Sequence, residues 1–385
     1  MFYCQHTLGI GHLVRSMEIV RHLVKDFQVC FIDGGEVIEG FKIPPGVEVI
    51  NLPPIKTDTE FKQLNAIGNS ETIEDILENR KNQLLSIFAR YRPDILIIEL
   101  FPFGRKKFTP ELIPLVEAAK STKTIVVSSL RDISITKKDK IAHEERVCGI
   151  MNQYFDVLLI HSDRKLIALE ESFSRVSDIK SQVYYTGYVA QQSEVSAEKS
   201  AVAKKEKPII LVSVGGGRFG HDLLESVIET APILKQNIPH HIQIFTGPFV
   251  PEEVFSKLKN KAKAQTNITI DKYTPNLIEY MEKADLSISM SGYNTTMNIL
   301  TTGVKAMMMA FTGNSDREQT MRAEKLEKLG RIQMIRPEDL EPEKLASKII
   351  EYLERQPKKL QLDFNGAEKT SAYLLQLLEK QKTIA

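Results

Sequence analysis

The chain has 385 residues and a formal net charge of +1, with 42% hydrophobic and 26% charged residues. This length suits two or three domains with sizeable cores, and the balanced charge argues against nucleic-acid binding. Because Cys4, Cys30 and Cys148 are isolated from one another, we expect a reduced, intracellular protein without a disulfide framework. No signal peptide is evident, and no apolar run approaches the roughly 18 residues of a membrane span.

Apolar strand-like runs alternate with amphipathic helices along nearly the whole chain, which predicts parallel sheets covered by helices on both faces. In the first half, the expected strands are 2–5, 28–32, 47–52, 95–100, 124–127, 157–160 and 183–186. In the second half, they are 209–214, 242–246, 268–271, 286–289, 306–309 and 331–334.

This alternation predicts an α/β protein of two Rossmann-like domains, at 1–192 and 207–362. Residues 193–206 are rich in Ser, Ala, Glu and Lys and are predicted to be a linker, with a surface loop inside one domain as the alternative. A terminal helix is expected within 363–385.

The first glycine-rich turn, Gly9-Ile10-Gly11-His12, follows the first strand and opens a helix. Val14 stands where a dinucleotide fingerprint has its third glycine, so the turn alone is a weak signal. His12 lies at the carboxyl end of a strand, where open α/β sheets bind ligands, and an imidazole can take a proton at neutral pH. We therefore predict His12 as a catalytic base, with a capping role as the alternative. Arg15, one turn later, is either a ligand contact or a surface residue.

Two acids, Glu99 and Asp132, end strands of the same domain and are candidate bases or orienting partners of His12. Structural pairing with Arg92, Arg105 or Arg131 is the alternative. The segment Phe101–Phe108 interleaves aromatic and cationic residues. It could rest on an anionic membrane or grip a lipid phosphate, or it could be a loop whose Phe side chains face the core.

A second glycine run, Gly215-Gly216-Gly217-Arg218-Phe219-Gly220, follows a strand and opens a helix. The next strand ends in Thr246-Gly247 rather than in the acidic residue of a ribose site, which argues against NAD. The glycines suit close approach of the backbone to a phosphate or a sugar, and a plain tight turn is the alternative.

The third turn, Ser291-Gly292-Tyr293-Asn294-Thr295, lies between a buried strand and a helix. Free N–H groups and the helix dipole make such a helix start an anion site, although Ser and Asn are also ordinary N-caps. Asp316-Arg317-Glu318-Gln319 follows, and a Glu-Gln pair suits hydroxyl groups. A nucleotide sugar carries both a diphosphate anion and sugar hydroxyl groups, so we predict a nucleotide-sugar enzyme.

The sequence lacks an Asp-x-Asp pair, a G-x-x-x-x-G-K-[ST] loop and an H-E-x-x-H motif. We therefore expect no essential metal and no cofactor other than the nucleotide sugar as co-substrate. Helix dipoles, backbone N–H groups and Arg218 would then meet the charge of the leaving group.

At these residues the chain resembles the GT-B glycosyltransferases, most of all the branch that contains the GlcNAc transferase of lipid II synthesis and uncharacterised bacterial relatives. The resemblance implies two Rossmann-like domains that face each other across a cleft, and a C-terminal helix that packs back on the first domain. It also implies donor contacts for the diphosphate turn (Ser291, Gly292, Asn294, Thr295), the sugar pair (Glu318, Gln319) and, for the uracil, Tyr273. From the residues themselves, we predict that the second glycine loop with its arginine contacts the same diphosphate (Gly215, Gly216, Gly217, Arg218).

On the acceptor side the resemblance implies contacts from Gly9 and Gly11, and the position of Arg15 one turn after His12 makes it a further candidate contact. The chain departs from the lipid II enzyme at Asn298, where that branch has a ribose-binding Glu. It also lacks a clear counterpart of the acceptor-side His-Glu segment. The segment Ser128–Asp132, with Arg131, takes that place and implies a different acceptor.

The combined prediction is a metal-independent, inverting glycosyltransferase that moves a hexose or N-acetylhexosamine from a UDP-sugar to an acceptor hydroxyl. The acceptor would be a small molecule or a lipid-linked one, and the protein would be cytoplasmic with peripheral membrane contact. The glycine-histidine turn also resembles that of the UDP-sugar hydrolase of pseudaminic acid synthesis. Hydrolysis and non-catalytic nucleotide-sugar binding therefore remain alternatives.

Overall fold

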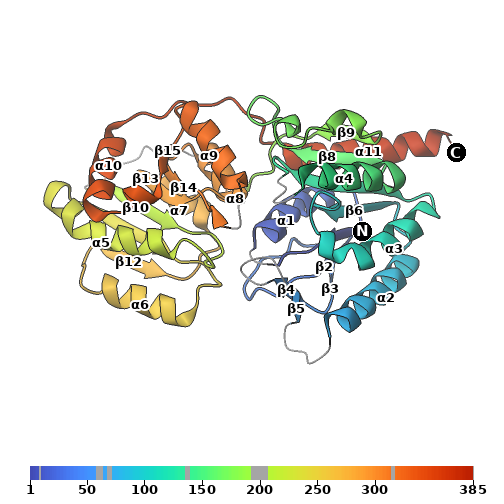
Figure 1. Ribbon diagram of the computed structural model, residues 1–385, viewed down its shortest axis with the longest axis horizontal. Coiled ribbons are helices and arrows are strands. Elements are labelled where there is room, and N and C mark those ends of the chain that lie inside the picture. The colour runs from blue at the N-terminus through green and yellow to red at the C-terminus, as the bar shows by residue number, and fades with distance from the viewer. Residues whose placement is uncertain are drawn as a thin grey trace. The chain divides into compact units, whose positions relative to one another are not determined.

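The computed structural model describes residues 1–7, 10–57, 64–66, 72–134, 139–191, 207–313 and 317–384. The chain forms two compact units, and Figure 1 shows the helices and strands of each. Unit 1 comprises Met1–Ala190 with Leu362–Ala385, and unit 2 comprises Gln191–Gln361. Gly9, Asp316 and the predicted linker at 193–206 lie outside the described residues.

Unit 1 contains a parallel sheet with the strand order β3-β2-β1-β6-β7-β8-β9. Its strands are β1 (Phe2–Cys4), β2 (Val29–Asp33), β3 (Val47–Asn51), β6 (Ile95–Glu99), β7 (Ile125–Arg131), β8 (Val157–His161) and β9 (Gln182–Tyr185). Its helices are α1 (Gly11–Leu23), α2 (Ile73–Tyr91), α3 (Thr109–Lys120), α4 (Lys140–Tyr154) and α11 (Gly366–Ile384), with 3-10 turns η1 (Lys106–Phe108), η2 (Leu169–Glu171) and η3 (Val176–Asp178).

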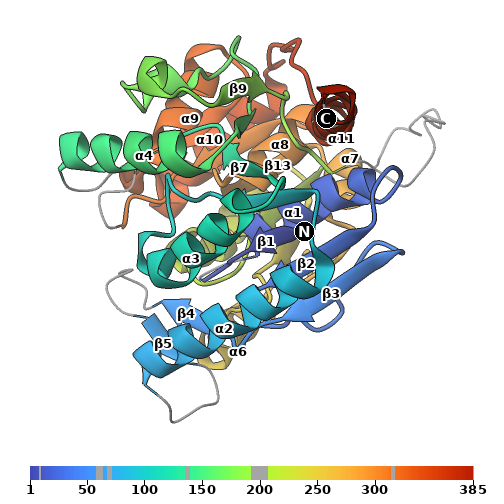
Figure 2. The same cartoon turned by 90° about the vertical axis from the view of Figure 1, so that its right-hand side faces the viewer.

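Successive side chains of a strand point to opposite faces of the sheet, and here both sets are apolar, so helices cover both faces. Tyr3 and Ile98 belong to the core beneath α2, α3 and α4, whereas Phe2 and Ile97 belong to the core beneath α1 and α11. Figure 2 shows α11, the last helix of the chain, in unit 1. It packs near α1, where the Ser371 hydroxyl donates a 2.8 Å hydrogen bond to Asp26.

A short antiparallel hairpin, β4 (Ile55–Thr57) and β5 (Leu64–Ala66), was missed by the sequence pattern. Each of these strands has a polar residue in the middle, Lys56 or Asn65, so neither forms an apolar run that the sequence pattern would reveal. Every strand expected from the sequence is present, with ends that differ by a few residues. The strand expected at 124–127 continues to Arg131, because its last residues pair with β8.

Unit 2 contains a second parallel sheet, in the order β12-β11-β10-β13-β14-β15. Its strands are β10 (Ile209–Ser213), β11 (His241–Phe245), β12 (Ile268–Asp271), β13 (Leu286–Met290), β14 (Ala306–Met309) and β15 (Gln333–Ile335). Its helices are α5 (His221–Asn237), α6 (Glu252–Ala262), α7 (Leu277–Lys283), α8 (Tyr293–Thr302), α9 (Glu318–Lys328) and α10 (Pro342–Glu354), with the 3-10 turn η5 (Pro337–Asp339).

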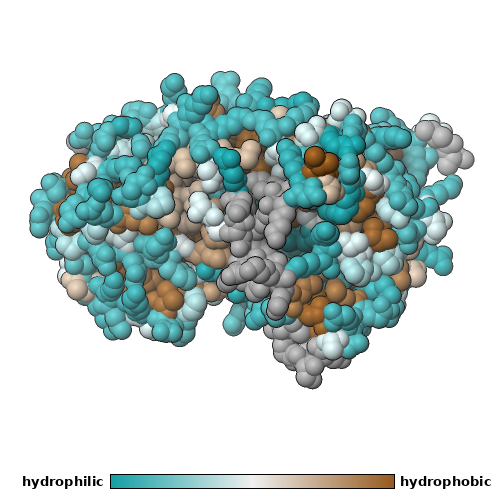
Figure 3. Space-filling model, in the orientation of Figure 1, coloured by the Kyte–Doolittle hydropathy of each residue, from teal (hydrophilic) through white to brown (hydrophobic). Residues whose placement is uncertain are grey.

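The predicted α/β class with parallel sheets is confirmed in both units. Since β10 lies between β11 and β13, the loops that follow these three strands lie next to one another at the carboxyl end of the sheet. The predicted turns Gly215–Gly217 and Ser291–Thr295 are both at this end. On the face of the molecule that Figure 3 shows, hydrophilic residues dominate and hydrophobic residues form separate groups.

Candidate active site

His12 lies in the first turn of α1 and contacts the acid at the end of β6. Its Nδ1 is 2.7 Å from Oε1 of Glu99. The two residues are 87 positions apart in the chain, and they meet because β1 pairs with β6 in the sheet. The His12 side chain is 18% exposed, whereas that of Glu99 is fully buried.

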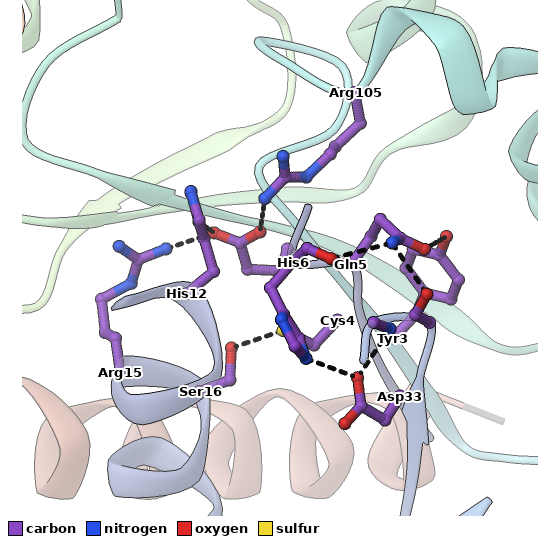
Figure 4. Close-up of polar contacts among 12 residues, drawn as sticks. Tyr3, Cys4, Gln5, His6, His12, Arg15, Ser16, Asp33 and Arg105 are labelled. Carbon is purple, nitrogen blue, oxygen red and sulfur yellow. Dashed lines mark hydrogen bonds and ion pairs between the residues drawn. The ribbon is translucent and has the colours of Figure 1, made fainter. Parts of the chain in front are cut away.

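Three side chains converge on the Glu99 carboxylate. They are the side chains of His12, Arg15 and Arg105, which Figure 4 labels. Arg15 forms a buried ion pair with Oε1, and Arg105 lies 3.4 Å from Oε2. Burial alone would raise the pKa of Glu99, but its interactions with His12, Arg15 and Arg105 hold that pKa well below its usual value. Glu99 is therefore an anion at neutral pH.

Burial lowers the pKa of His12 from its ordinary 6.5 to about 3, although Glu99 opposes this shift. A neutral imidazole carries one N–H, and the carboxylate of Glu99 can only accept. The Nδ1–H of His12 therefore donates to Glu99, and Nε2 carries the lone pair. Nε2 can therefore accept a proton, and the Glu99 anion stabilises the imidazolium that forms, which opposes the effect of burial.

Arg15 is 2% exposed, so the alternative that it is a surface residue is wrong. Its side chain lies one turn after His12 and is engaged by Glu99. An acceptor contact for Arg15 stays a prediction, as it does for Gly11, the exposed first residue of α1.

Glu99, one of the two predicted strand-end acids, contacts His12. Asp132 follows β7 and is fully buried, and its neighbour Arg131 is half-buried. A catalytic role for Asp132 and an acceptor role for Arg131 stay predictions.

The segment Phe101–Phe108 does not present its aromatic rings for a membrane surface. Phe101, Phe103 and Phe108 are between 0 and 4% exposed and belong to the core of unit 1. The interpretation with core-facing Phe side chains is therefore correct. What this loop supplies to the site is Arg105, which has a left-handed φ of 58° at the start of η1.

A buried polar row next to Glu99 was missed by sequence reasoning. Ser129 pairs with Glu99 across β6 and β7, and its hydroxyl lies 2.8 Å from Nε2 of His161. Nδ1 of His161 lies 2.9 Å from the hydroxyl of Thr186. Burial lowers the pKa of His161 to about 3, with Arg15 acting in the same direction. The available signal was position, since His161 also ends a strand of the first sheet.

In unit 2, the loop Gly215–Gly217 packs against the loop that follows β11. Gly217 has a φ of 86°, and a Cβ there would lie 2.5 Å from the carbonyl oxygen of Thr246. Close packing between the two loops therefore accounts for Gly217. Gly215 is exposed with open space at its Cβ position. The guanidinium of Arg218 lies 4.8 Å from the ring centre of Phe249.

The third predicted turn forms the start of α8. Gly292 is its N-cap, in an extended conformation without a side-chain capping hydrogen bond, and a Cβ at Gly292 would meet open space. Asn294 and Thr295 lie half-buried in the first helical turn. Ser291 is fully buried, and its hydroxyl donates to the carbonyl oxygen of Gln319 at 3.2 Å. This hydroxyl is thus engaged within the protein.

The Glu-Gln pair opens α9 and lies beside that turn. Glu318 Oε1 is 2.7 Å from Nη2 of Arg322, and Gln319 Oε1 accepts the N–H of Phe311 at 3.1 Å. Arg322 also donates to the carbonyl oxygen of Ser291. The structure therefore brings the predicted diphosphate turn and the predicted sugar pair together. Sequence reasoning missed Arg322, although its spacing of four residues from Glu318 is typical of a helical ion pair.

Two further predicted donor positions lie in unit 2. Tyr273 follows β12 and is 37% exposed, and partial burial raises the pKa of its hydroxyl. Asn298, where the lipid II branch has a Glu, is buried in α8 and donates a 3.1 Å hydrogen bond to Gln191. The residues that the structure describes contain no group of three or more His, Cys, Asp or Glu side chains arranged to hold a metal ion. Among the described helices, none combines the length and the apolar character needed to cross a membrane.

Residues 209–376 match the glycosyltransferase family 28 C-terminal domain. A curated relative from Desulforamulus reducens is 23% identical over 90% of this chain and 88% of its own length. It is named UDP-N-acetylglucosamine--N-acetylmuramyl-(pentapeptide) pyrophosphoryl-undecaprenol N-acetylglucosamine transferase. A relative of the same name from Acetivibrio thermocellus is 23% identical over 92% of this chain and 90% of its own length.

Solved structures share the fold over the whole chain. The Acinetobacter baumannii MurG structure is 15% identical, with a TM-score of 0.57 over 98% of this chain and 99% of that one. The glycotransferase of kitacinnamycin is 16% identical, with a TM-score of 0.58 over 99% of this chain and 98% of that one. The chain is therefore a glycosyltransferase with the GT-B fold, and it resembles the branch of the lipid II GlcNAc transferases, as its motifs predicted.

Proposed function

We propose that this protein transfers a sugar from a UDP-sugar to an acceptor hydroxyl, with UDP-GlcNAc as the first donor to test. The observation that carries the proposal is the neutral His12 held by the buried Glu99 anion at the carboxyl edge of the sheet. This pair has the arrangement of a general base and its orienting acid.

In the proposed reaction, the acceptor oxygen attacks the anomeric carbon as the bond from that carbon to the UDP oxygen breaks. UDP leaves with the bonding electron pair, and the acceptor proton moves to Nε2 of His12. Glu99 stabilises the resulting imidazolium, which burial alone would disfavour. A single displacement of this kind inverts the configuration at the anomeric carbon.

On the donor side, we assign the diphosphate to the start of α8 and the exposed Gly215 loop. A helix start supplies N–H groups and partial positive charge, which supports this assignment. Arg218 would add a full positive charge. Glu318 and Gln319 would bind sugar hydroxyls, Tyr273 would contact the uracil, and the reaction would need neither a metal nor a further cofactor.

The relatives' name supports the choice of substrates to test, because it names UDP-N-acetylglucosamine as donor and a pyrophosphoryl-undecaprenol as acceptor. We extend this to a lipid-linked or small-molecule acceptor for the present chain. A lipid-linked acceptor would require contact with the cytoplasmic face of a membrane. Gly11, Arg15 and Arg131 would contact the acceptor.

Hydrolysis is the second candidate, because the His12–Glu99 pair can activate water as readily as an alcohol. The test is UDP release from a panel of UDP-sugars, with and without N-acetylmuramyl-pentapeptide pyrophosphoryl-undecaprenol and simpler alcohol acceptors. Release that depends on acceptor, with an inverted anomeric product and no loss in EDTA, supports transfer without a metal. Equal release without any acceptor supports hydrolysis, and tight UDP-sugar binding without turnover refutes both.

A further inference from the structure

Arg322 is a buried cation in α9 that contacts both halves of the predicted donor site. Its side chain is 0% exposed. Nη1 donates to the carbonyl oxygen of Ser291 at 3.1 Å, and Nη2 donates to Oε1 of Glu318 at 2.7 Å. Its guanidinium carbon lies 5.6 Å from the ring centre of Tyr293. One guanidinium thus reaches the turn before α8 and the first residue of α9.

These contacts are part of a small set of links between the same two segments. The Ser291 hydroxyl donates to the carbonyl oxygen of Gln319, whose side-chain oxygen accepts the N–H of Phe311 just after β14. The first turn of α9 is therefore tied both to the start of α8 and to the end of β14. The planar fork of an arginine can hold a carbonyl and a carboxylate in fixed relative positions, which a lysine cannot do.

Stability is a poor explanation for this buried ion pair. A buried pair loses the hydration of both charges, and apolar residues of similar volume often serve a fold as well or better. The pair is instead located where the predicted diphosphate turn meets the predicted sugar pair. A rigid connection at this point fixes the distance between the two groups that would recognise one donor molecule.

We propose that Arg322 is a positioning residue that joins the diphosphate turn to Glu318, so that UDP and its attached sugar are recognised as one unit. This inference rests on the proposed donor site. Arg322 acts through Ser291 and Glu318 and need not touch the donor. Its loss leaves a buried carboxylate without its cation and releases the start of α9, while the backbone N–H groups of α8 remain.

The test compares Arg322→Met with Arg331→Met in the full chain. Arg331 is a matched control because it is also buried, lies in unit 2 and bonds to α8 at the opposite end, through the carbonyl oxygen of Ile299. Titration calorimetry with UDP and with UDP-GlcNAc measures both affinities. We expect Arg322→Met to lower the affinity for UDP-GlcNAc about tenfold, which is the equivalent of one charged hydrogen bond. The affinity for UDP should fall by much less. Arg331→Met should leave the ratio of the two affinities unchanged.

Two further variants separate positioning from simple loss of folding. Arg322→Lys keeps the charge and much of the volume but loses the fork, so its UDP-GlcNAc affinity should be intermediate. In a Glu318→Gln background, Arg322→Met should cause a smaller additional loss, because the two residues act on the same contact. Thermal unfolding of each variant identifies any that do not fold.

An unchanged ratio of UDP-GlcNAc to UDP affinity in both Arg322 variants overturns the inference while the proposed function stands. Fully additive effects of the Arg322 and Glu318 substitutions on UDP-GlcNAc affinity would also overturn the inference and leave the proposed function standing. If the unaltered protein binds UDP but shows no added affinity for any UDP-sugar, the proposed sugar pair fails, and the inference fails with it.

Discussion

Replacing Glu99 by Gln tests the central electrostatic argument about the site. The change keeps an oxygen that can accept the Nδ1–H of His12 but removes the negative charge that stabilises the imidazolium. Two unit charges about 4 Å apart interact by roughly 4 kcal/mol at an effective dielectric constant of about 20. Since a neutral hydrogen bond of about 1 kcal/mol can remain, we expect a net loss of about 2–4 kcal/mol. This corresponds to a fall in kcat of about 30- to 1,000-fold.

The same change also affects stability, because Arg15 and Arg105 lose their shared carboxylate. Breaking a buried ion pair typically costs about 3–5 kcal/mol, so urea unfolding must accompany the kinetics. Glu111→Gln is the matched control, since Glu111 is a buried acid of the same unit that pairs with Arg80 at 2.7 Å. It should lower stability and leave kcat per folded molecule unchanged.

The assay is steady-state UDP release, with UDP-sugar affinity measured separately. We expect Glu99→Gln to lower kcat and leave the UDP-sugar affinity within about threefold, because Glu99 lies in unit 1 and the predicted donor residues lie in unit 2. A kcat within threefold of the unaltered protein would refute the assignment of Glu99 as the partner of a catalytic His12. If kcat falls as much for Glu111→Gln as for Glu99→Gln, general loss of structure explains both effects.

Three other predictions concern individual residues and pH. His12→Ala should lower turnover by about 10²- to 10⁴-fold with donor binding little changed, and equal turnover would remove His12 from the mechanism. Gln319→Ala should lower the affinity for UDP-sugars more than the affinity for UDP, and equal losses of the two affinities, measured by calorimetry, would refute its role in binding the sugar. Because folding lowers the pKa of His12 and of His161 from 6.5 to about 3, the unfolded chain binds more protons between these values, so stability should fall as pH drops below 6.5. Each histidine changes the free energy of unfolding by up to about 1.4 kcal/mol per pH unit. The urea midpoint of His161→Asn should therefore fall less steeply with decreasing pH than that of the unaltered protein. An unchanged slope would contradict the buried neutral state of His161.

Local sequence patterns were sufficient for the fold class and for the position of the turns. Apolar runs flanked by amphipathic helices predict parallel strands because each strand in such a sheet is buried on both faces. Glycines and small polar residues directly after a strand mark its carboxyl end, where α/β proteins bind ligands. The turns before His12 and Tyr293 were found in this way from a few neighbouring residues.

Contacts between distant segments were decided by the tertiary structure. Glu99 and Asp132 look alike in sequence, and the pairing of β1 with β6 puts Glu99 next to His12. The Phe101–Phe108 segment has the composition of a surface loop, yet its rings complete the core of unit 1. Arg322 reaches Ser291 only because α9 packs beside the start of α8. Strand order and helix packing depend on how the whole chain buries its apolar surface, and no local window of sequence contains that information.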